Sequence, residues 1–267
     1  MSAHRPSGKP VLLDSRHNDG GQPTPGNGFE VGSLAGPDGV PVCSSALGWE
    51  DPGFRFYMQS AAHCVNFANN HTIQFDGNPY NAGTYSGYIA TLYGNPNYCC
   101  SLDWLLDATL IGVPATPSIA GEMFTGSNTS STKVDIRSIS AMVQNTTYCA
   151  NGAATGTHCN VRRTHPYSQR LNFCAPSSCY LDVVQVYSTN GALMFGEGDS
   201  GGNVYRASDG RVVATITAGN ADYYCLSANY YGPDTICTNT SGWVTEVTRV
   251  ASELAETNPD LVSRLRP

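Results

Sequence analysis

A short glycine-rich segment, residues 196–202 (GEGDSGG), most restricts what this chain can fold into. A serine hydroxyl is a poor nucleophile at neutral pH, so a reactive one needs a neighbouring base and donors that stabilise the oxyanion formed on attack. Gly198 can adopt backbone angles closed to other residues, which lets its N–H and that of Ser200 point at one place. Gly201 and Gly202 are expected to let a substrate approach the backbone closely. The segment predicts a nucleophile, Ser200, beside its own oxyanion hole, although Gly-rich segments with Asp-Ser are also common in turns.

The order of residues along the chain excludes one fold. Residues 198–202 satisfy the G-x-S-x-G pattern of the α/β-hydrolase elbow, a fold that places its histidine after the serine. Here all six histidines precede Ser200, namely His4, His17, His63, His71, His158 and His165. The α/β-hydrolase interpretation therefore fails, and the order to search for is His, then Asp, then Ser.

A histidine and an aspartate upstream supply the missing groups. His63 closely follows residues 54–59 (FRFYMQ), whose aromatic content predicts a strand. Asp107 opens residues 107–113 (DATLIGV), an apolar run that predicts a second strand. A triad aspartate is buried, accepts the imidazole N–H and fixes its tautomer. Asp103 is the alternative acid and ranks second, because a loop acid or turn cap is its simpler role.

Composition predicts an all-β fold and excludes several partners. The 28 Gly, 16 Pro and 15 Tyr among 267 residues indicate many short strands joined by tight turns, and 40% hydrophobic content suffices for a substantial core. A net charge of −7 without a Lys- or Arg-rich block argues against nucleic acid or an anionic membrane as a partner. Lys9 and Lys133 are the only lysines, which leaves little room for a Ser/Lys dyad.

The ten cysteines favour disulfides over zinc, because they lack a repeated C-x-x-C spacing. Disulfides persist in oxidising compartments, and no apolar run is long enough to span a bilayer. We therefore expect a secreted protein, with its export signal absent from the present sequence. A Cys43–Cys64 disulfide is the simplest pairing that would hold His63 in place.

Four segments, in this order, resemble segments of the chymotrypsin-like serine peptidases. Residues 61–64 (AAHC), 107–111 (DATLI) and 198–202 (GDSGG) resemble the three catalytic signatures of that family. Residues 149–159 (CANGAATGTHC) resemble the disulfide hairpin of its bacterial secreted branch, which includes α-lytic protease and the Streptomyces proteases. The resemblance implies two six-stranded antiparallel β-barrels with a cleft between them, and a disulfide between Cys149 and Cys159.

The resemblance also assigns roles. It implies that His63 is the general base, that Asp107 orients it, and that Ser200 is the nucleophile. It implies that the N–H groups of Gly198 and Ser200 form the oxyanion hole. No metal or organic cofactor is expected. The expected partner is a protein or peptide substrate, bound by a monomer.

The expected organisation has four parts. Residues 1–28 are polar and rich in Gly and Pro, which predicts an extended arm. The resemblance implies a first barrel over residues 29–133 and a second over residues 134–242. Apolar residues at helical spacing, with Ser241 as a candidate N-cap, predict a C-terminal helix within residues 243–267 that packs on a barrel.

The chain departs from the family at the acid that precedes the serine. It has no Ile-Val-Gly-Gly-like start whose freed amino group would pair with Asp199, and Ala150 stands where the bacterial branch often has a basic residue. A buried carboxylate without a partner is costly. We therefore expect another cation for Asp199, with Arg137, Arg162 and Arg163 as the candidates.

The specificity pocket also departs from the family. Met194 stands where trypsin-like enzymes have an acid, so cleavage after Arg or Lys is not expected. Phe195 and Ile216 are expected to shorten the pocket and favour small or medium apolar side chains. Residues 214–219 (ATITAG) predict a strand that pairs with substrate, and the resemblance places Thr217 where a serine touches the triad acid. The expected substrate-binding residues are Met194, Phe195, Ile216, Thr217, Ala218 and Gly219.

Six further cysteines are expected to be paired. In the bacterial branch the position of Met194 is commonly a cysteine bridged to a later one, but here Cys225 is expected to pair with Cys237. Four more, Cys99, Cys100, Cys174 and Cys179, form either a vicinal bridge plus a small loop or two links between loops, and the sequence does not choose between these pairings.

The predicted function is that of a secreted serine endopeptidase that forms an acyl-enzyme through His63, Asp107 and Ser200. Two alternatives remain open. One is a catalytically silent binding protein of the same fold, with a blocked pocket or a collapsed oxyanion hole. The other is an esterase of small acyl groups, for which the same three residues would serve.

Overall fold

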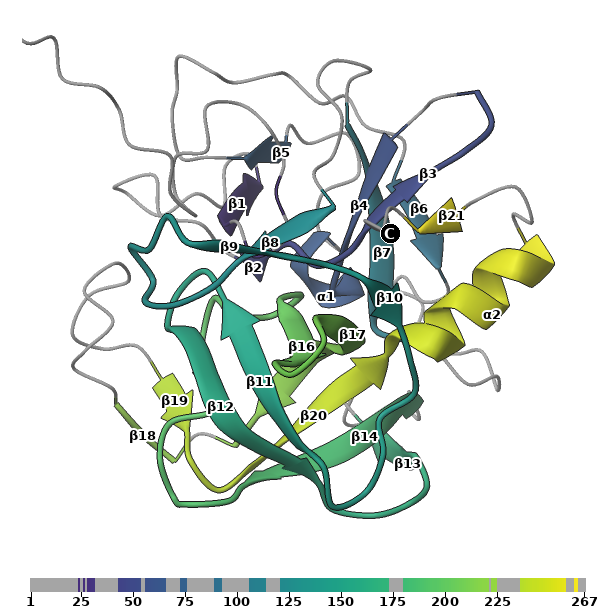
Figure 1. Cartoon of the computed structure of the whole chain (residues 1–267). Helices are drawn as coiled ribbons and strands as arrows, with labels where there is room; N and C mark the ends of the chain where they lie inside the picture. Colours follow the sequence, from purple (N-terminus) through teal and green to yellow (C-terminus); the bar gives the residue numbers. More distant parts are fainter. Residues whose placement is uncertain are drawn as a thin grey trace, which may run out of the picture.

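Strands dominate the described part of the chain, as the predicted all-β class requires (Figure 1). The structure is a computed structural model, and it describes residues 24, 26, 28–31, 43–53, 56–65, 73–75, 89–92, 106–113, 121–172, 180–220, 222–224, 236–257 and 262–263. The strands of these residues form five sheets, and two helices accompany them. Neither helix has the length and apolar character needed to cross a membrane.

A five-stranded antiparallel sheet contains the strand that precedes His63 and the strand that follows Asp107. Its strand order is β21-β3-β4-β7-β6. Strands β4 and β7 pair with Ser60 opposite Thr109. Because β4 ends and β7 begins at the same end of the sheet, the residues that follow Ser60 lie beside those that precede Ala108. The bounds are β3 Gly48–Glu50, β4 Phe56–Ser60, β6 Ile89–Leu92, β7 Ala108–Val113 and β21 Val262–Ser263.

Six strands of the second half close on themselves. Strand β20 pairs with both β14 and β17, which completes the ring β16-β11-β12-β14-β20-β17. Closure leaves no free edge within the ring, and β10 and β13 add to its outside. The bounds are β10 Ser138–Ile139, β11 Thr147–Gly152, β12 Gly156–Arg163, β13 Gln169–Asn172, β14 Tyr180–Ser188, β16 Asn203–Arg206, β17 Arg211–Gly219 and β20 Ser241–Glu246.

Three smaller sheets complete the described strands. One has the order β2-β1-β5, one has the order β15-β19-β18, and β8 pairs with β9. The β15-β19-β18 sheet leads directly into the segment of Ser200, residues 196–202, since β15 ends at Gly196. The bounds are β1 Gly28–Val31, β2 Cys43–Ser44, β5 Ile73–Phe75, β8 Glu122–Phe124, β9 Lys133–Asp135, β15 Phe195–Gly196, β18 Tyr223–Tyr224 and β19 Ile236–Thr238.

The C-terminal helix is present but begins later than residue 243. Residues Ser241–Glu246 are strand β20, whose Val244 pairs with both Val184 and Ile216. Pairing on both sides overrides the helical spacing seen in the sequence. Helix α2 spans Val247–Thr257, and the short helix α1 spans Ala62–Val65.

The two halves share a core. One buried cluster joins Trp49 and Leu110 of the first sheet to Tyr205 and Val212 of the closed ring. Helix α2 adds Val247, Val250 and Leu254 to the same cluster, and Figure 1 shows it at the side of the molecule where the two halves meet. One buried apolar cluster therefore connects the five-stranded sheet, the closed ring and helix α2.

Candidate active site

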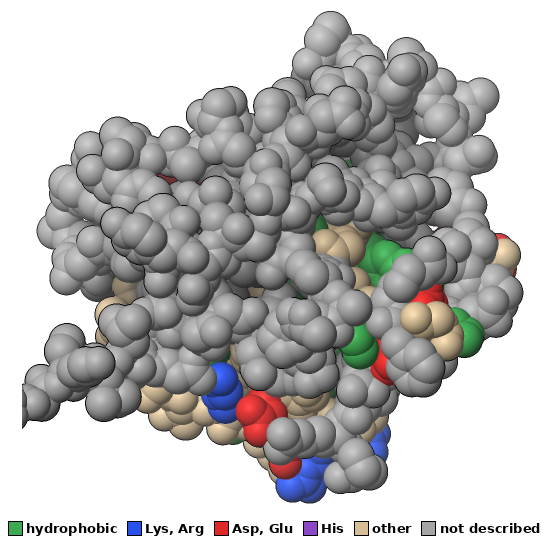
Figure 2. All heavy atoms as spheres, turned by 90° about the horizontal axis from the view of Figure 1, so that it is seen from above, with side chains coloured by type: hydrophobic (Ala, Val, Ile, Leu, Met, Phe, Trp, Pro, Cys, Tyr) green, Lys and Arg blue, Asp and Glu red, His purple; other side chains and the backbone are tan. Residues whose placement is uncertain are grey.

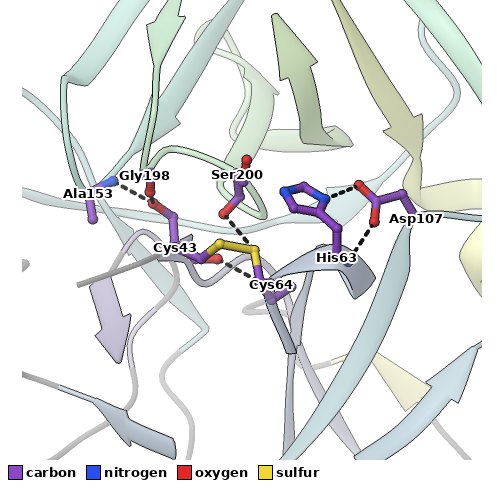
Figure 3. Close-up of a disulfide and its surroundings, with 9 residues drawn as sticks. Cys43, His63, Cys64, Asp107, Ala153, Gly198 and Ser200 are labelled. Carbon is purple, nitrogen blue, oxygen red and sulfur yellow. Dashed lines mark hydrogen bonds and ion pairs between the residues drawn. A yellow bond between two sulfur atoms is a disulfide. The ribbon is translucent and has the colours of Figure 1, made fainter. Parts of the chain in front are cut away.

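His63 and Asp107 contact each other through two hydrogen bonds. The ring Nδ1 lies 2.8 Å from Asp107 Oδ2, and the backbone N–H of His63 donates to Asp107 Oδ1 at 3.0 Å (Figure 3). The Asp107 side chain is 2% exposed, whereas the His63 side chain is 44% exposed. Both carboxylate oxygens of Asp107 thus bond to His63, and the neutral imidazole carries its proton on Nδ1.

The electrostatics of this pair act on the histidine in opposite directions. Partial burial of the ring lowers the pKa of His63, but the charge of Asp107 and its hydrogen bond together outweigh burial, and the pKa lies above its ordinary value. The imidazole is consequently a stronger base than a free histidine. A proton acceptor of this kind suits general base catalysis near neutral pH.

Ser200 lies on the other side of the imidazole from Asp107, and the second ring nitrogen, Nε2, faces it (Figure 3). Among the described residues no hydrogen bond joins Ser200 Oγ to His63. Such bonds are often long in proteins without substrate and tighten on binding. The structure thus brings together the three residues that the sequence singled out.

The backbone around Ser200 presents two open donors. Gly198 has a φ of 89°, in the region that favours glycine. Within the described residues, the N–H groups of Gly198 and Ser200 have no hydrogen-bond acceptor. Their carbonyls, by contrast, are held: Ser44 Oγ donates to Gly198 O and the Ser44 N–H donates to Ser200 O, both at 2.8 Å. Donors left open beside a nucleophile are the arrangement that an oxyanion hole requires.

Gly201 and Gly202 pack closely against other backbone segments in the protein interior, whereas the sequence led us to expect that they let substrate approach. A Cβ atom on Gly201 would lie 2.1 Å from Ser60 Oγ and 2.4 Å from Ser44 O. A Cβ atom on Gly202 would lie 2.4 Å from Asn151 O. These glycines allow the serine segment to pack directly on β2, β4 and β11.

Asp199 is fully buried and has neutral hydrogen-bond donors instead of the expected cation. Its Oδ1 accepts from the N–H groups of Ala154 at 2.9 Å and Thr155 at 3.0 Å. Its Oδ2 accepts from the Gly196 N–H at 2.9 Å and from Thr155 Oγ1 at 2.5 Å. Burial raises the pKa of Asp199, although the bonds from Thr155 and Gly196 and the charge of His158 act in the opposite direction.

The three arginines considered as partners of Asp199 lie elsewhere. Arg163 pairs with Glu246 at 3.0 Å and Arg162 donates to Thr147 Oγ1 at 2.8 Å. Arg137 lines a separate hollow of about 480 Å³ near β9. The prediction of a substitute arginine was wrong, because the hairpin turn after β11 and the Gly196 N–H supply the hydrogen-bond donors to Asp199.

A pocket of about 210 Å³ opens beside Ser200. Phe195, Ile216, Ala218 and Gly219 line it as expected. Five residues that the sequence did not single out as pocket residues join them: Gly196, Glu197, Asn220, Cys237 and Thr238. The Phe195 ring packs on two glycines, since a Cβ atom on Gly242 would lie 2.3 Å from Phe195 Cζ and one on Gly219 would lie 3.2 Å from Cε2.

Two residues expected in this pocket are not among those that line it. Met194 is fully buried in the apolar core of the closed ring. Thr217 is buried on the other face of β17, where its hydroxyl lies 2.9 Å from Thr245 Oγ1 and makes no described contact with Asp107. Alternation of side chains along the strand explains this placement, because Ile216 and Ala218 on either side line the pocket.

Two disulfides lie within the described residues, Cys43–Cys64 and Cys149–Cys159. The first connects β2 to the helix that carries His63, and the second closes the β11–β12 hairpin. Cys237 is also disulfide-bonded. Its expected partner Cys225 lies outside the described residues, as do Asp103, Cys99, Cys100, Cys174 and Cys179.

Charged side chains away from this site are interleaved. Figure 2 shows described basic and acidic side chains next to one another on the visible face. Asp209 contacts both Arg206 and Arg211, the latter at 3.1 Å. Opposite charges therefore lie within contact distance around Asp209.

Comparison with solved structures gives the fold a name. Protease A of Thermobifida fusca superposes with a TM-score of 0.60 at 14% identity, over 92% of this chain and 100% of that one. A Cellulomonas bogoriensis chymotrypsin gives 0.56 at 16% identity, over 92% and 98%. A Nocardiopsis protease gives 0.58 at 14% identity, over 92% and 100%.

No model of a protein family and no curated protein sequence matches the chain. At these identities the structural likeness establishes the fold. The chain has the chymotrypsin-like β-barrel protease fold with a C-terminal helix, as the resemblance implied.

Proposed function

We propose that this protein is a secreted serine endopeptidase with His63, Asp107 and Ser200 as its catalytic residues. The observation that carries the proposal is the arrangement of His63, which is bonded to Asp107 through Nδ1 and turns Nε2 toward Ser200. The open N–H groups of Gly198 and Ser200 support it. The fold shared with bacterial proteases and the two disulfides support the class of enzyme and its export.

The proposed reaction begins when Ser200 Oγ attacks the carbonyl carbon of the scissile peptide and its proton passes to His63 Nε2. The electron pair of the carbonyl moves to its oxygen, which accepts hydrogen bonds from Gly198 and Ser200. Collapse breaks the C–N bond, and His63 returns the proton to the leaving amine. Water then attacks the acyl-enzyme by the same route and releases the acid. Asp107 stays ionised throughout and stabilises the imidazolium.

The pocket favours small or medium apolar side chains before the scissile bond. Its walls include Phe195, Ile216 and Ala218, and the Phe195 ring occupies space beside Gly219 and Gly242. The one acidic side chain among the described lining residues, Glu197, is exposed. A buried Arg or Lys side chain would lack a buried charge partner, which disfavours trypsin-like cleavage.

Labelling with a fluorophosphonate, followed by cleavage of a diverse peptide library, tests the proposal. We expect labelling of wild type and of the surface control Ser208→Ala, and none of Ser200→Ala, together with cleavage after small or medium apolar residues. Labelling without peptide cleavage, but with hydrolysis of small esters, would identify an esterase. A folded, disulfide-bonded wild type that is neither labelled nor active would contradict the proposal and favour a binding protein.

A further inference from the structure

We propose that Ser44 and Thr155 are positioning residues that hold the oxyanion hole in place through neutral hydrogen bonds. We call these two residues the neutral clamp. The inference rests on the proposed function, because the position of the hole matters only if Ser200 attacks a carbonyl. Thr155 contacts Asp199, for which the sequence suggested an arginine, and Ser44 holds the neighbouring carbonyl of Gly198.

Ser44 has the chemistry that its place requires. Its Oγ donates its one proton to Gly198 O at 2.8 Å and accepts from the Ala153 N–H at 2.7 Å. A hydroxyl group can donate to a carbonyl and accept from an N–H through the same oxygen atom, which the methyl group of alanine cannot do. Ser44 is fully buried, so bulk solvent does not compete for either bond. Figure 3 shows Ala153 beside Gly198, the two groups that this hydroxyl joins.

The backbone of Ser44 adds a second attachment. Its N–H donates to Ser200 O at 2.8 Å, and its carbonyl accepts from Ser60 Oγ at 2.9 Å. Ser44 thus contacts the carbonyls of both residues whose N–H groups form the proposed hole. Because Cys43 is bonded to Cys64, the same short segment is also tied to the helix of His63.

Thr155 holds the side chain of Asp199, the residue between Gly198 and Ser200. Its hydroxyl donates to Asp199 Oδ2 and its N–H donates to Asp199 Oδ1, so one residue contacts both carboxylate oxygens. The fit is close: a Cβ atom on Gly152 would lie 2.3 Å from Asp199 Oδ1. The Cys149–Cys159 disulfide closes the hairpin that carries Thr155. The buried side chain of Asp199 is therefore fixed against the hairpin.

The test compares Ser44→Ala and Thr155→Val with wild type in peptide hydrolysis. Loss of one oxyanion donor typically lowers kcat by about 100-fold or more, so a displaced hole is expected to lower it by about 10- to 100-fold. KM is expected to change by less than about twofold, since the ground-state carbonyl binds the hole weakly. Thr155→Ser keeps the hydroxyl and should restore kcat to within about threefold. Thr147→Val, on the exposed face of the same hairpin, should match wild type.

A purely structural role would lower the melting temperature of the variants while leaving kcat unchanged below it, and that result overturns the proposal. Thr155→Ser as impaired as Thr155→Val would also overturn it. If Ser44→Ala does not fold, Ser44→Cys takes its place, because a thiol keeps a weak donor and acceptor. The kcat of Ser44→Cys should lie below that of wild type, and a kcat equal to wild type would contradict the proposal. Inactivity of wild type toward peptides rejects the proposed function, whereas active wild type with unaffected variants rejects the clamp alone.

Discussion

The histidine side and the serine side of the candidate site are held by different kinds of interaction. On the first side, an ionisable pair carries the contact, with Asp107 buried and the His63 ring 44% exposed. On the second side, the described partners of Asp199 are neutral donors, and Ser44 beside it is fully buried. The exposed side is the one whose protonation changes in the proposed reaction.

The difference follows from what each side must do. His63 must accept and return a proton, so it needs an accessible ring and a nearby charge that stabilises its cation. The loop around Ser200 must keep two N–H groups in place, so it needs rigid, fully satisfied hydrogen bonds. Each of the following changes affects one side and spares the other.

The largest effect is expected from Asp107→Asn. An amide cannot stabilise the imidazolium, and it favours the wrong tautomer of His63, so kcat should fall by about 10⁴-fold. Steady-state kinetics measure this, with Asp209→Asn as a matched surface carboxylate. Folding of the serine side should be unchanged. A loss below about tenfold would mean that His63 does not depend on Asp107.

A smaller but structural effect is expected from Gly201→Ala on the serine side. The new methyl group would lie 2.1 Å from Ser60 Oγ and 2.4 Å from a backbone oxygen, at a φ of 84°. We expect the free energy of unfolding, measured in urea, to be about 3 kcal/mol lower than in wild type, because the methyl group strains the backbone and displaces its neighbours. The control is Gly191→Ala, which has a φ of 70° but no atom within 4 Å of the new Cβ. That variant should lose only about 1 kcal/mol, and equal losses would contradict the packing argument.

The smallest effect is a shift in pH dependence on the histidine side. Asp107 holds the pKa of His63 above its ordinary value, and the proposed base works only when neutral. As the pH falls through this raised pKa, kcat/KM should therefore decline, beginning at a higher pH than for a free histidine. NMR titration of the His63 ring should show the raised pKa in wild type and a lower one in Asp107→Asn. The same pKa in both would remove Asp107 as its cause.

Much of the site was predictable from local sequence. The Gly-rich segment around Ser200, the histidine after an aromatic strand and the aspartate before an apolar strand each follow from short-range patterns. Their order along the chain excluded the α/β-hydrolase fold. Ser44 and Thr155 carried only weak signals, one next to a cysteine and the other within the disulfide hairpin, because a hydroxyl group in a turn is ordinary without its distant partner.

The sequence by itself determined the all-β class, the order of the three candidate catalytic residues and the approximate place of the C-terminal helix. Tertiary structure decided the rest. Strand pairing on both sides moved the start of that helix to Val247, and β17 directed Thr217 away from the pocket. Three of the four described hydrogen bonds to Asp199 come from a turn about 45 residues earlier. These outcomes depend on contacts between segments far apart in the chain, which local composition and spacing do not encode.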